Sequence, residues 1–306
     1  MKYVFIAMVA LLLLTACTST TKQPSSFNPY KGPYGLKTEF MKNAPPAKIF
    51  QEEDFNVIVK VQNAGAFNIS KDEKTEGYLY FIYDSYYFTL NGSEEPTEIE
   101  LPGKHYFNQE GSLETYSYLF HARTIEGQRE SPSSKILMNV CYPYTTKLTA
   151  DVCIDKDPFN LDARKKSCSA KLLTFANQGA PVAITRVEPR MTVSDNRVTP
   201  SFAITLKNVG GGTMIQKTEQ SIQQQCVLKE SPTQLWGKLI INASLFNRPL
   251  DCNPNPVNFM NNEGTVNCKL IGDPLELTFI SQPDILTIQT DYLYFQTSSK
   301  DVQIVR

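Results

Sequence analysis

Alternation of apolar and polar side chains stands out in two segments of the chain, and in each it predicts a β-strand. Successive side chains of a strand point to opposite faces, so such a segment has one face that can be buried. Each run ends in an Asn-x-Gly turn, at residues 63–65 and 208–210. The alternating positions are Val57, Val59 and Val61 in the first segment and Phe202, Ile204 and Leu206 in the second.

The two segments also match one another, which predicts a tandem duplication. When Asn63 is set on Asn208, the apolar positions coincide, and Ile69 falls on Met214. A second match follows in both halves and predicts a last strand pair joined by a turn. Its paired segments are residues 118–120 with 292–295, and residues 133–140 with 298–305. Two matches in the same order favour duplication over chance.

Strands and turns account for most of the remaining chain. The best helical candidate, residues 217–228, has few apolar positions and is interpreted as a polar loop with a short turn. Short β-rich runs at 235–245 and 275–280, bounded by Asn, Gly and Pro, favour antiparallel sandwiches. The predicted fold class is all-β, with two tandem Ig-like antiparallel β-sandwiches. The predicted units are a signal peptide (1–16), a polar tether (17–35), sandwich 1 (36–141), a cysteine-bearing connector (142–181) and sandwich 2 (182–306).

Two stretches carry a family resemblance. The strand that ends in the Asn-x-Gly turn of each half resembles the CARDB-type Ig-like modules of prokaryotic surface proteins. The run from Cys141-Tyr142-Pro143-Tyr144 to Cys153-Ile154-Asp155, together with residues 178–182, resembles a segment of uncharacterised archaeal membrane-associated proteins. These resemblances imply a fold and a location at the cell surface, and they supply no catalytic residues.

The N-terminus has the pattern of a secretory signal. One lysine precedes an apolar run at residues 3–14, and the small residues Thr15 and Ala16 follow. The run is too short for a membrane-spanning helix, which needs about 20 apolar residues. Leu14-Thr15-Ala16-Cys17 resembles the lipobox of prokaryotic lipoproteins, and this implies a diacylglyceryl thioether on Cys17 as the first mature residue. The alternative is a plain secretory signal that ends in a cysteine by chance.

The segment after Cys17 is rich in Thr, Ser, Lys and Pro, as expected of a tether that holds a folded domain away from a surface. Two acyl chains anchor a protein stably where one is marginal. No later stretch has the apolar length of a membrane-spanning helix. We therefore expect an extracytoplasmic protein, anchored to the cell membrane by lipidated Cys17, with the membrane as its first partner.

The composition and net charge of the chain limit which classes of partner it can bind. The 306 residues suit about two domains. Lys and Arg total 30 and Asp and Glu total 31, for a net charge of −1, which argues against nucleic acid or an acidic membrane surface as a partner, since either needs a basic patch or tail. Apolar residues at 41% and charged residues at 20% are enough for a buried core and exclude a disordered chain.

Six cysteines remain after Cys17, an even number that predicts up to three disulfides in an exported chain. A zinc site is disfavoured because no two of them have the close spacing of a metal knuckle. The first expected bridge is Cys153–Cys168, across a polar loop. The second is Cys252–Cys268, and Cys141–Cys226 follows by elimination.

The sequence contains no convincing catalytic constellation. The two histidines, His105 and His121, lie at a turn and after a strand, and no G-x-S-x-G elbow is present. Oxygen ligands gather between Asp155 and Asp162, as in a calcium loop, but without the glycine and distal Glu of an EF-hand. A turn-rich loop between cysteines explains them as well. We predict no catalytic residues, no metal and no cofactor.

A tyrosine-rich stretch is the most prominent binding feature. Alternation places Tyr78, Tyr80 and Ile82 on one face of a strand, and Leu79, Phe81 and Tyr83 on the other. With both faces apolar, burial inside a sandwich is the first interpretation. The alternative is an exposed face that stacks sugars or contacts a partner. The candidate binding residues are Tyr78, Tyr80, Tyr83, Tyr86 and Tyr87.

The expected function is therefore a non-enzymatic, lipid-anchored cell-surface protein with a binding or scaffolding role, whose further partners are envelope proteins or glycans. One alternative is a carbohydrate-active or other extracytoplasmic enzyme on a β-sandwich. Another is an envelope assembly subunit that pairs through sheet edges. Asn68, Asn91 and Asn242 match N-glycosylation acceptors, a motif that also occurs by chance.

Overall fold

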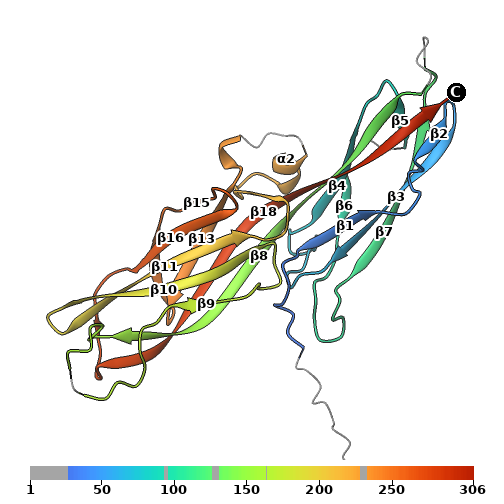
Figure 1. The fold of residues 1–306 in the computed structure, drawn as a ribbon. Coiled ribbons are helices and arrows are strands. Elements are labelled where there is room, and N and C mark those ends of the chain that lie inside the picture. Colours follow the sequence, from blue (N-terminus) through green and yellow to red (C-terminus); the bar gives the residue numbers. More distant parts are fainter. Residues whose placement is uncertain (1–26, 93–95, 126–130, 163, 228–232) are drawn as a thin grey trace, which may run out of the picture.

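The computed structural model describes residues 27–92, 96–125, 131–162, 164–227 and 233–306, and shows an elongated, nearly all-β protein with two lobes (Figure 1). The predicted all-β fold class is confirmed. The predicted signal peptide and Cys17 lie outside the described residues. The polar segment at 217–228 contains only the short helix α2 (Ile222–Cys226) within its described part.

Lobe 1 holds two facing sheets. The first has the strand order β1-β3-β7-β5, with antiparallel neighbours, and the second has the order β6-β4-β8. Phe81 of β4 meets Tyr118 and Phe120 of β7 edge-on, with ring centroids 4.8 and 5.6 Å apart, so the two sheets pack face to face. The strands are β1 (Leu36–Phe40), β2 (Lys48–Phe50), β3 (Asp54–Asn63), β4 (Gly77–Tyr83), β5 (Phe88–Asn91), β6 (Thr97–Ile99), β7 (Leu113–Ala122) and β8 (Ser133–Asp155).

Lobe 2 follows the same scheme. Its first sheet has the order β9-β10-β11-β16-β14, and β13 lies beside the long strand β18 in the second. The segment between β11 and β13 contains β12, α2 and the 3-10 helix η1 (Thr233–Leu235). The strands are β9 (Leu173–Thr174), β10 (Val182–Ser194), β11 (Arg197–Asn208), β12 (Thr213–Ile215), β13 (Lys238–Leu245), β14 (Arg248–Asn253), β15 (Val257–Asn258), β16 (Glu263–Leu270), β17 (Leu275–Glu276) and β18 (Ser281–Val305).

The pairing of lobe 1 recurs in lobe 2 strand by strand, in support of the predicted duplication. The corresponding pairs are β1–β3 and β10–β11, β3–β7 and β11–β16, β5–β7 and β14–β16, β4–β6 and β13–β15, and β4–β8 and β13–β18. The alternating residues that predicted β3 and β11 are fully buried in both strands, which confirms their apolar faces.

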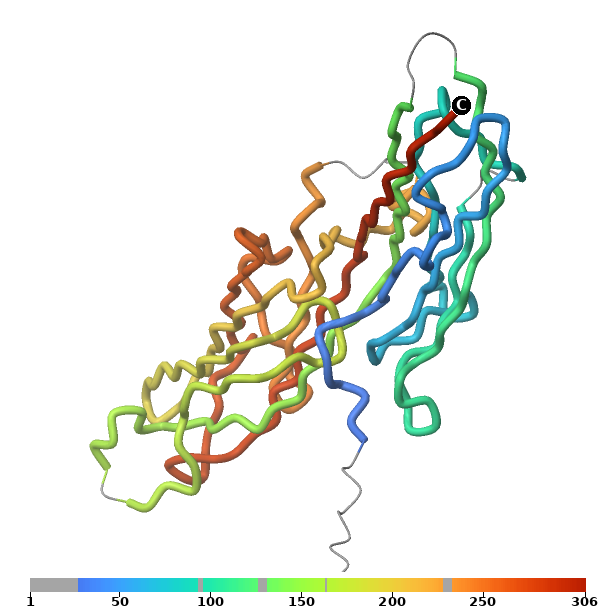
Figure 2. Tube along the Cα trace, turned by 45° about the vertical axis from the view of Figure 1, so that its right-hand side comes forward, coloured from blue at the N-terminus to red at the C-terminus, as the bar shows by residue number. Residues whose placement is uncertain are grey.

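Two long strands join the lobes. β8 pairs antiparallel with β18 from Ser133 and Gln303 at one end to Asp155 and Ser281 at the other. The first part of β8 lies beside β4 in lobe 1, and the rest of β8 runs on into lobe 2. β18 begins beside β13 in lobe 2 and ends in lobe 1, where β2 pairs with it (Figures 1 and 2). Each lobe is thus completed by half of a strand that belongs to the other repeat.

The structure differs from the predicted domain boundaries. Residues 142–155, assigned to the connector, continue β8 without a break, and residues 296–305, assigned to sandwich 2, lie in lobe 1. The second sequence match also fails, because 292–305 lies within the single strand β18 with no turn, and its residues 298–303 pair with 133–138 across the ribbon. Alternation occurs in every strand with one buried face, so periodicity alone does not identify which segments correspond.

Candidate functional site

Four tyrosines fill the waist where the lobes meet, two from each long strand. Tyr142 lies opposite Tyr294 and Tyr144 opposite Tyr292, and all four side chains are at most 1% exposed. Alternate residues of a strand share a face, so the four rings lie on one side of the ribbon. Their centroids lie 5.8 to 6.5 Å from those of neighbouring tyrosines, and the rings therefore form one packed cluster.

Each of these hydroxyls accepts a hydrogen bond from a backbone N–H of a neighbouring segment. Two of the donors are the first residues of β1 and β10, and the other two lie in the turns after β3 and β11. The pairs are Tyr142 with Leu36 N (3.0 Å), Tyr292 with Val182 N (3.3 Å), Tyr144 with Phe67 N (3.2 Å) and Tyr294 with Gly212 N (2.8 Å). The cluster thus satisfies corresponding backbone groups in both repeats.

The Asn-x-Gly turns have the same internal bond in both lobes. Asn63 Nδ2 donates to Phe67 O at 2.8 Å, and Asn208 Nδ2 donates to Gly212 O at 2.7 Å. Each asparagine therefore closes a turn, and the residue four positions after it donates its backbone N–H to a waist tyrosine. Sequence analysis found these turns but missed the tyrosines they contact. The signal was present as the recurring Tyr-x-Tyr at 142–144 and 292–294.

Burial in the waist keeps these phenols protonated. It raises the pKa of Tyr294 to about 12 and holds the pKa values of Tyr142 and Tyr292 well above the ordinary value. The waist is accordingly a neutral hydrogen-bonded core. Because its hydroxyls bond to backbone groups of both lobes, the waist joins the lobes.

A groove of about 460 Å³ opens next to the waist, between β1 and β18. Hydrogen-bonding side chains dominate its lining, and the Lys60–Glu39 ion pair (3.7 Å) lies on it. Its lining residues are Tyr34, Leu36, Lys37, Thr38, Glu39, Lys60, Gln62, Leu113, Gly210, Gly211, Gln296, Thr297 and Ser298. These groups suit hydrogen bonding to a polar ligand.

Two strand edges without partners border this groove. β1 pairs only with β3 among the described strands, whereas its counterpart β10 also pairs with β9. The edge of β18 away from β8 is covered by β13, β12 and β2 in turn, and residues 296–302 are left without a described strand partner there. Gln303 N donates to Ala47 O on that edge, so strand alternation turns the N–H groups of Thr297, Ser299 and Asp301 the same way.

The five tyrosines of the predicted binding face do not share a face. Tyr78 is buried beside α2, and Tyr80 Oη donates to Cys226 O at 3.2 Å on the same side. Tyr83 packs into lobe 1, with its ring 5.2 Å from that of Phe120. Tyr86 and Tyr87 follow in the turn after β4. Core packing is therefore the better account of the strand residues, as the alternation at 78–83 indicated.

The three expected disulfides are present, in the expected pairs. Cys252 and Cys268 lie directly opposite one another on β14 and β16. Cys141–Cys226 fastens α2 to the outer side of β8. Cys153–Cys168 closes the loop after β8. These bridges indicate an oxidising, extracytoplasmic compartment for the folded chain.

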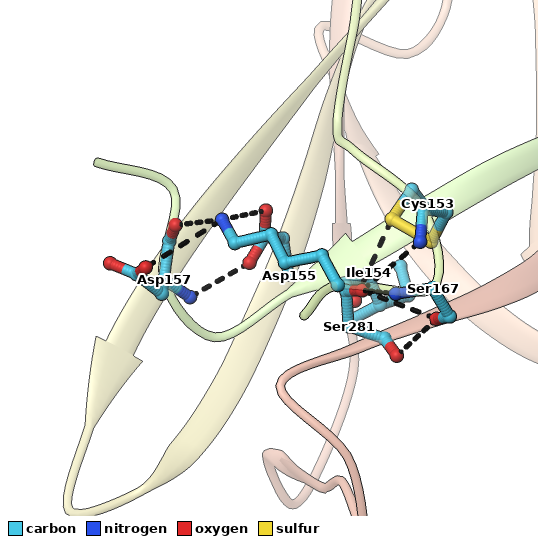
Figure 3. Close-up of a disulfide and its surroundings, with 8 residues drawn as sticks. Cys153, Ile154, Asp155, Asp157, Ser167 and Ser281 are labelled. Atoms are coloured by element: carbon cyan, nitrogen blue, oxygen red, sulfur yellow. Dashed lines mark hydrogen bonds and ion pairs between the residues drawn. A yellow bond between two sulfur atoms is a disulfide. The ribbon is translucent and has the colours of Figure 1, made fainter. Parts of the chain in front are cut away.

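The acidic side chains of the loop after β8 are paired with a lysine of the same loop (Figure 3). Lys166 Nζ lies 2.8 Å from Asp155 Oδ2 and also donates to the backbone oxygen of Asp157. The oxygens of Asp157 accept the N–H groups of Leu161 and Asp162, which lowers the pKa of Asp157. The loop is thus an internally neutralised turn. This arrangement agrees with the structural interpretation of these carboxylates.

The charged cluster around His121 was the nearest approach to a catalytic constellation. His121 Nδ1 lies 2.8 Å from Asp54 Oδ1, and Thr124 donates its hydroxyl hydrogen to Glu52, which lowers the pKa of Glu52. The Thr124 hydroxyl is thus bonded to Glu52, and the His121 imidazole is bonded to Asp54. Across the described residues, no group of three or more His, Cys, Asp and Glu is placed to hold a metal ion.

Comparison with known proteins adds no assignment. No model of a known protein family matches the chain, and no curated protein matches its sequence. Among the described residues, no helix is long and apolar enough to cross a membrane.

Proposed function

We propose that this protein is a non-enzymatic, lipid-anchored envelope protein that binds an extended polypeptide segment in the groove beside its waist. The signal pattern and Cys17 support export and anchoring, and the three disulfides fit the oxidising side of the membrane. The two lobes are CARDB-like, Ig-like sandwiches, and their exchanged strands make them a single scaffold for the groove.

The observation that carries this proposal is the partnerless edge of β18 at residues 296–302. Sheet edges bind extended peptides by adding a strand, with main-chain hydrogen bonds for affinity and side-chain contacts for specificity. Here the edge is bounded by β12 at one end and β2 at the other, which limits the added strand to a short segment. Thr38, Gln62 and Gln296 supply polar contacts along it.

The same edge supports a second candidate function, an envelope assembly subunit. In that case the added strand comes from another copy of the chain, because an open edge pairs with any strand of suitable register. The two functions share a binding site and differ in its occupant.

Replacement of Cys17 by serine tests the anchor. The variant is expected to lose membrane fractionation, because it lacks the thiol that forms the thioether. The measurement is fractionation of cells, with mass spectrometry of the N-terminal peptide for the acyl groups. A C17S protein that is correctly cleaved and sediments with membranes as fully as the native protein would place the anchor elsewhere.

Substitution of Ser299 by proline tests the open edge of β18 that borders the groove. Proline removes an N–H from the open edge and leaves the bonds to β8 in place, so the fold is expected to survive. A photoreactive residue at Thr297 is expected to crosslink to a polypeptide on intact cells. The adduct should disappear with S299P and persist with the matched control S299A.

The composition of the adduct separates the two candidate functions. An adduct with a different protein supports the binding function, and a homodimer supports assembly. The proposal is contradicted if the adduct survives S299P or if Thr297 yields no more of it than a probe at Ser194, at the far end of lobe 2.

A further inference from the structure

Exposed aromatic side chains lie near the first described residues of the chain. Phe107 is 90% exposed and Tyr106 is 72% exposed on the loop between β6 and β7, with their rings 5.3 Å apart. Tyr30, on the N-terminal segment, is 53% exposed. Figures 1 and 2 show this loop at the end of lobe 1 where the described chain begins.

The loop and the N-terminal segment are in direct contact. Lys104 Nζ donates to the backbone oxygen of Lys31 at 3.3 Å, and Lys104 N donates to Gly65 O at the waist. The loop is closed on itself by reciprocal backbone bonds between His105 and Asn108, each 3.0 Å long. Tyr106 and Phe107 are therefore held at the apex of a tight turn beside Lys104 and Lys31, where nothing in the described chain covers them.

The chemistry of this patch matches a membrane interface. Aromatic rings with a polar end settle at the headgroup level of a bilayer, and lysines beside them are attracted to anionic headgroups. Partial burial, together with the charge of Lys37, lowers the pKa of Lys104. Separate apolar residues on a surface need no explanation, but adjacent exposed aromatics beside lysines indicate a contact surface.

The number of residues between Cys17 and the described chain sets how far this patch can lie from the membrane. Ten residues lead from Cys17 to Phe27, and they can extend on the order of 35 Å. A lipid on Cys17 therefore keeps this side of the protein close to the bilayer that holds the acyl chains. We propose that Tyr106 and Phe107, with Lys31 and Lys104, dock on the lipid surface and orient the waist groove relative to the membrane. This inference rests on the proposed anchoring at Cys17.

A tryptophan probe tests the contact in the lipidated full-length protein, reconstituted in vesicles of phosphatidylcholine and phosphatidylglycerol. F107W is expected to show blue-shifted emission that brominated lipids quench, above the constant background of Trp236. The matched control is F50W, because Phe50 is 59% exposed and lies on β2, away from the tether. Equal quenching of F107W and F50W overturns the proposal.

A second measurement separates failure of this contact from failure of the anchor. The C17S chain without acyl groups should sediment weakly with the same vesicles. Y106S/F107S should lower that partition by about tenfold, and K31Q/K104Q should lower it only when phosphatidylglycerol is present. An unacylated Cys17 in the native protein, with the partition still sensitive to Y106S/F107S, overturns the anchor and retains the contact. Partition unchanged by Y106S/F107S overturns the contact whatever the state of Cys17.

Discussion

Replacement of Tyr292 by alanine is expected to lower the free energy of unfolding of the whole molecule by about 3–5 kcal/mol. The side chain is fully buried at the waist, so its removal leaves a cavity beside Tyr144 and Tyr294. It also leaves Val182 N without the hydroxyl that accepts its hydrogen bond, and removes one of the two partners of the Thr146 hydroxyl, which keeps its bond to Val182 O. Denaturant unfolding followed by circular dichroism measures the change.

Two further variants separate packing from hydrogen bonding. Y292F keeps the ring and should cost about 1–3 kcal/mol, the penalty for a buried backbone N–H without an acceptor. Y86A removes an exposed tyrosine outside the waist and should change stability by less than about 0.5 kcal/mol. Tyr292 bonds to lobe 2 and its ring packs against Tyr144, which bonds to lobe 1, so Y292A is expected to destabilise both lobes. Destabilisation of lobe 2 alone by Y292A would show that the waist does not couple them.

Local features of this fold follow from the sequence because they depend on neighbouring residues. Alternation at Val57, Val59 and Val61 predicts the strand and its buried face, and Asn63 marks the turn that ends it. Cysteine spacing also predicts the disulfides, since Cys153 and Cys168 enclose a polar loop with few apolar contacts of its own. These inferences need no knowledge of how the two halves meet.

The arrangement of the halves could not be predicted in the same way. The segments 133–140 and 298–305 match in sequence, yet 298–305 is the end of β18 and pairs with 133–138 of β8 through residues 298–303. The strand exchange depends on contacts between residues more than a hundred positions apart, which one sequence does not reveal. The groove shares this origin, because its edges come from β1 and β18. Tyr142 and Tyr294 likewise meet only through that ribbon.

Ending the chain at Phe295 is expected to unfold lobe 1 and to leave lobe 2 largely intact. The removed residues supply the part of β18 that pairs with β8 in lobe 1, and Val302 and Ile304 among them are fully buried. Loss of these two side chains alone costs about 3–6 kcal/mol, comparable with the entire stability of many domains. Hydrogen exchange should show loss of protection in β4 and the first part of β8, with β11 and β16 still protected.

This experiment separates the exchanged arrangement from two self-contained tandem sandwiches. If residues 36–141 formed a complete sandwich, a truncation at Phe295 would damage lobe 2, which contains the neighbouring sequence, and spare lobe 1. The double variant V302A/I304A provides a milder change at the same place, and it should weaken protection in lobe 1 without affecting β11. Loss of protection confined to lobe 2 in the truncated chain would contradict the strand exchange, because β18 would then serve only its own repeat.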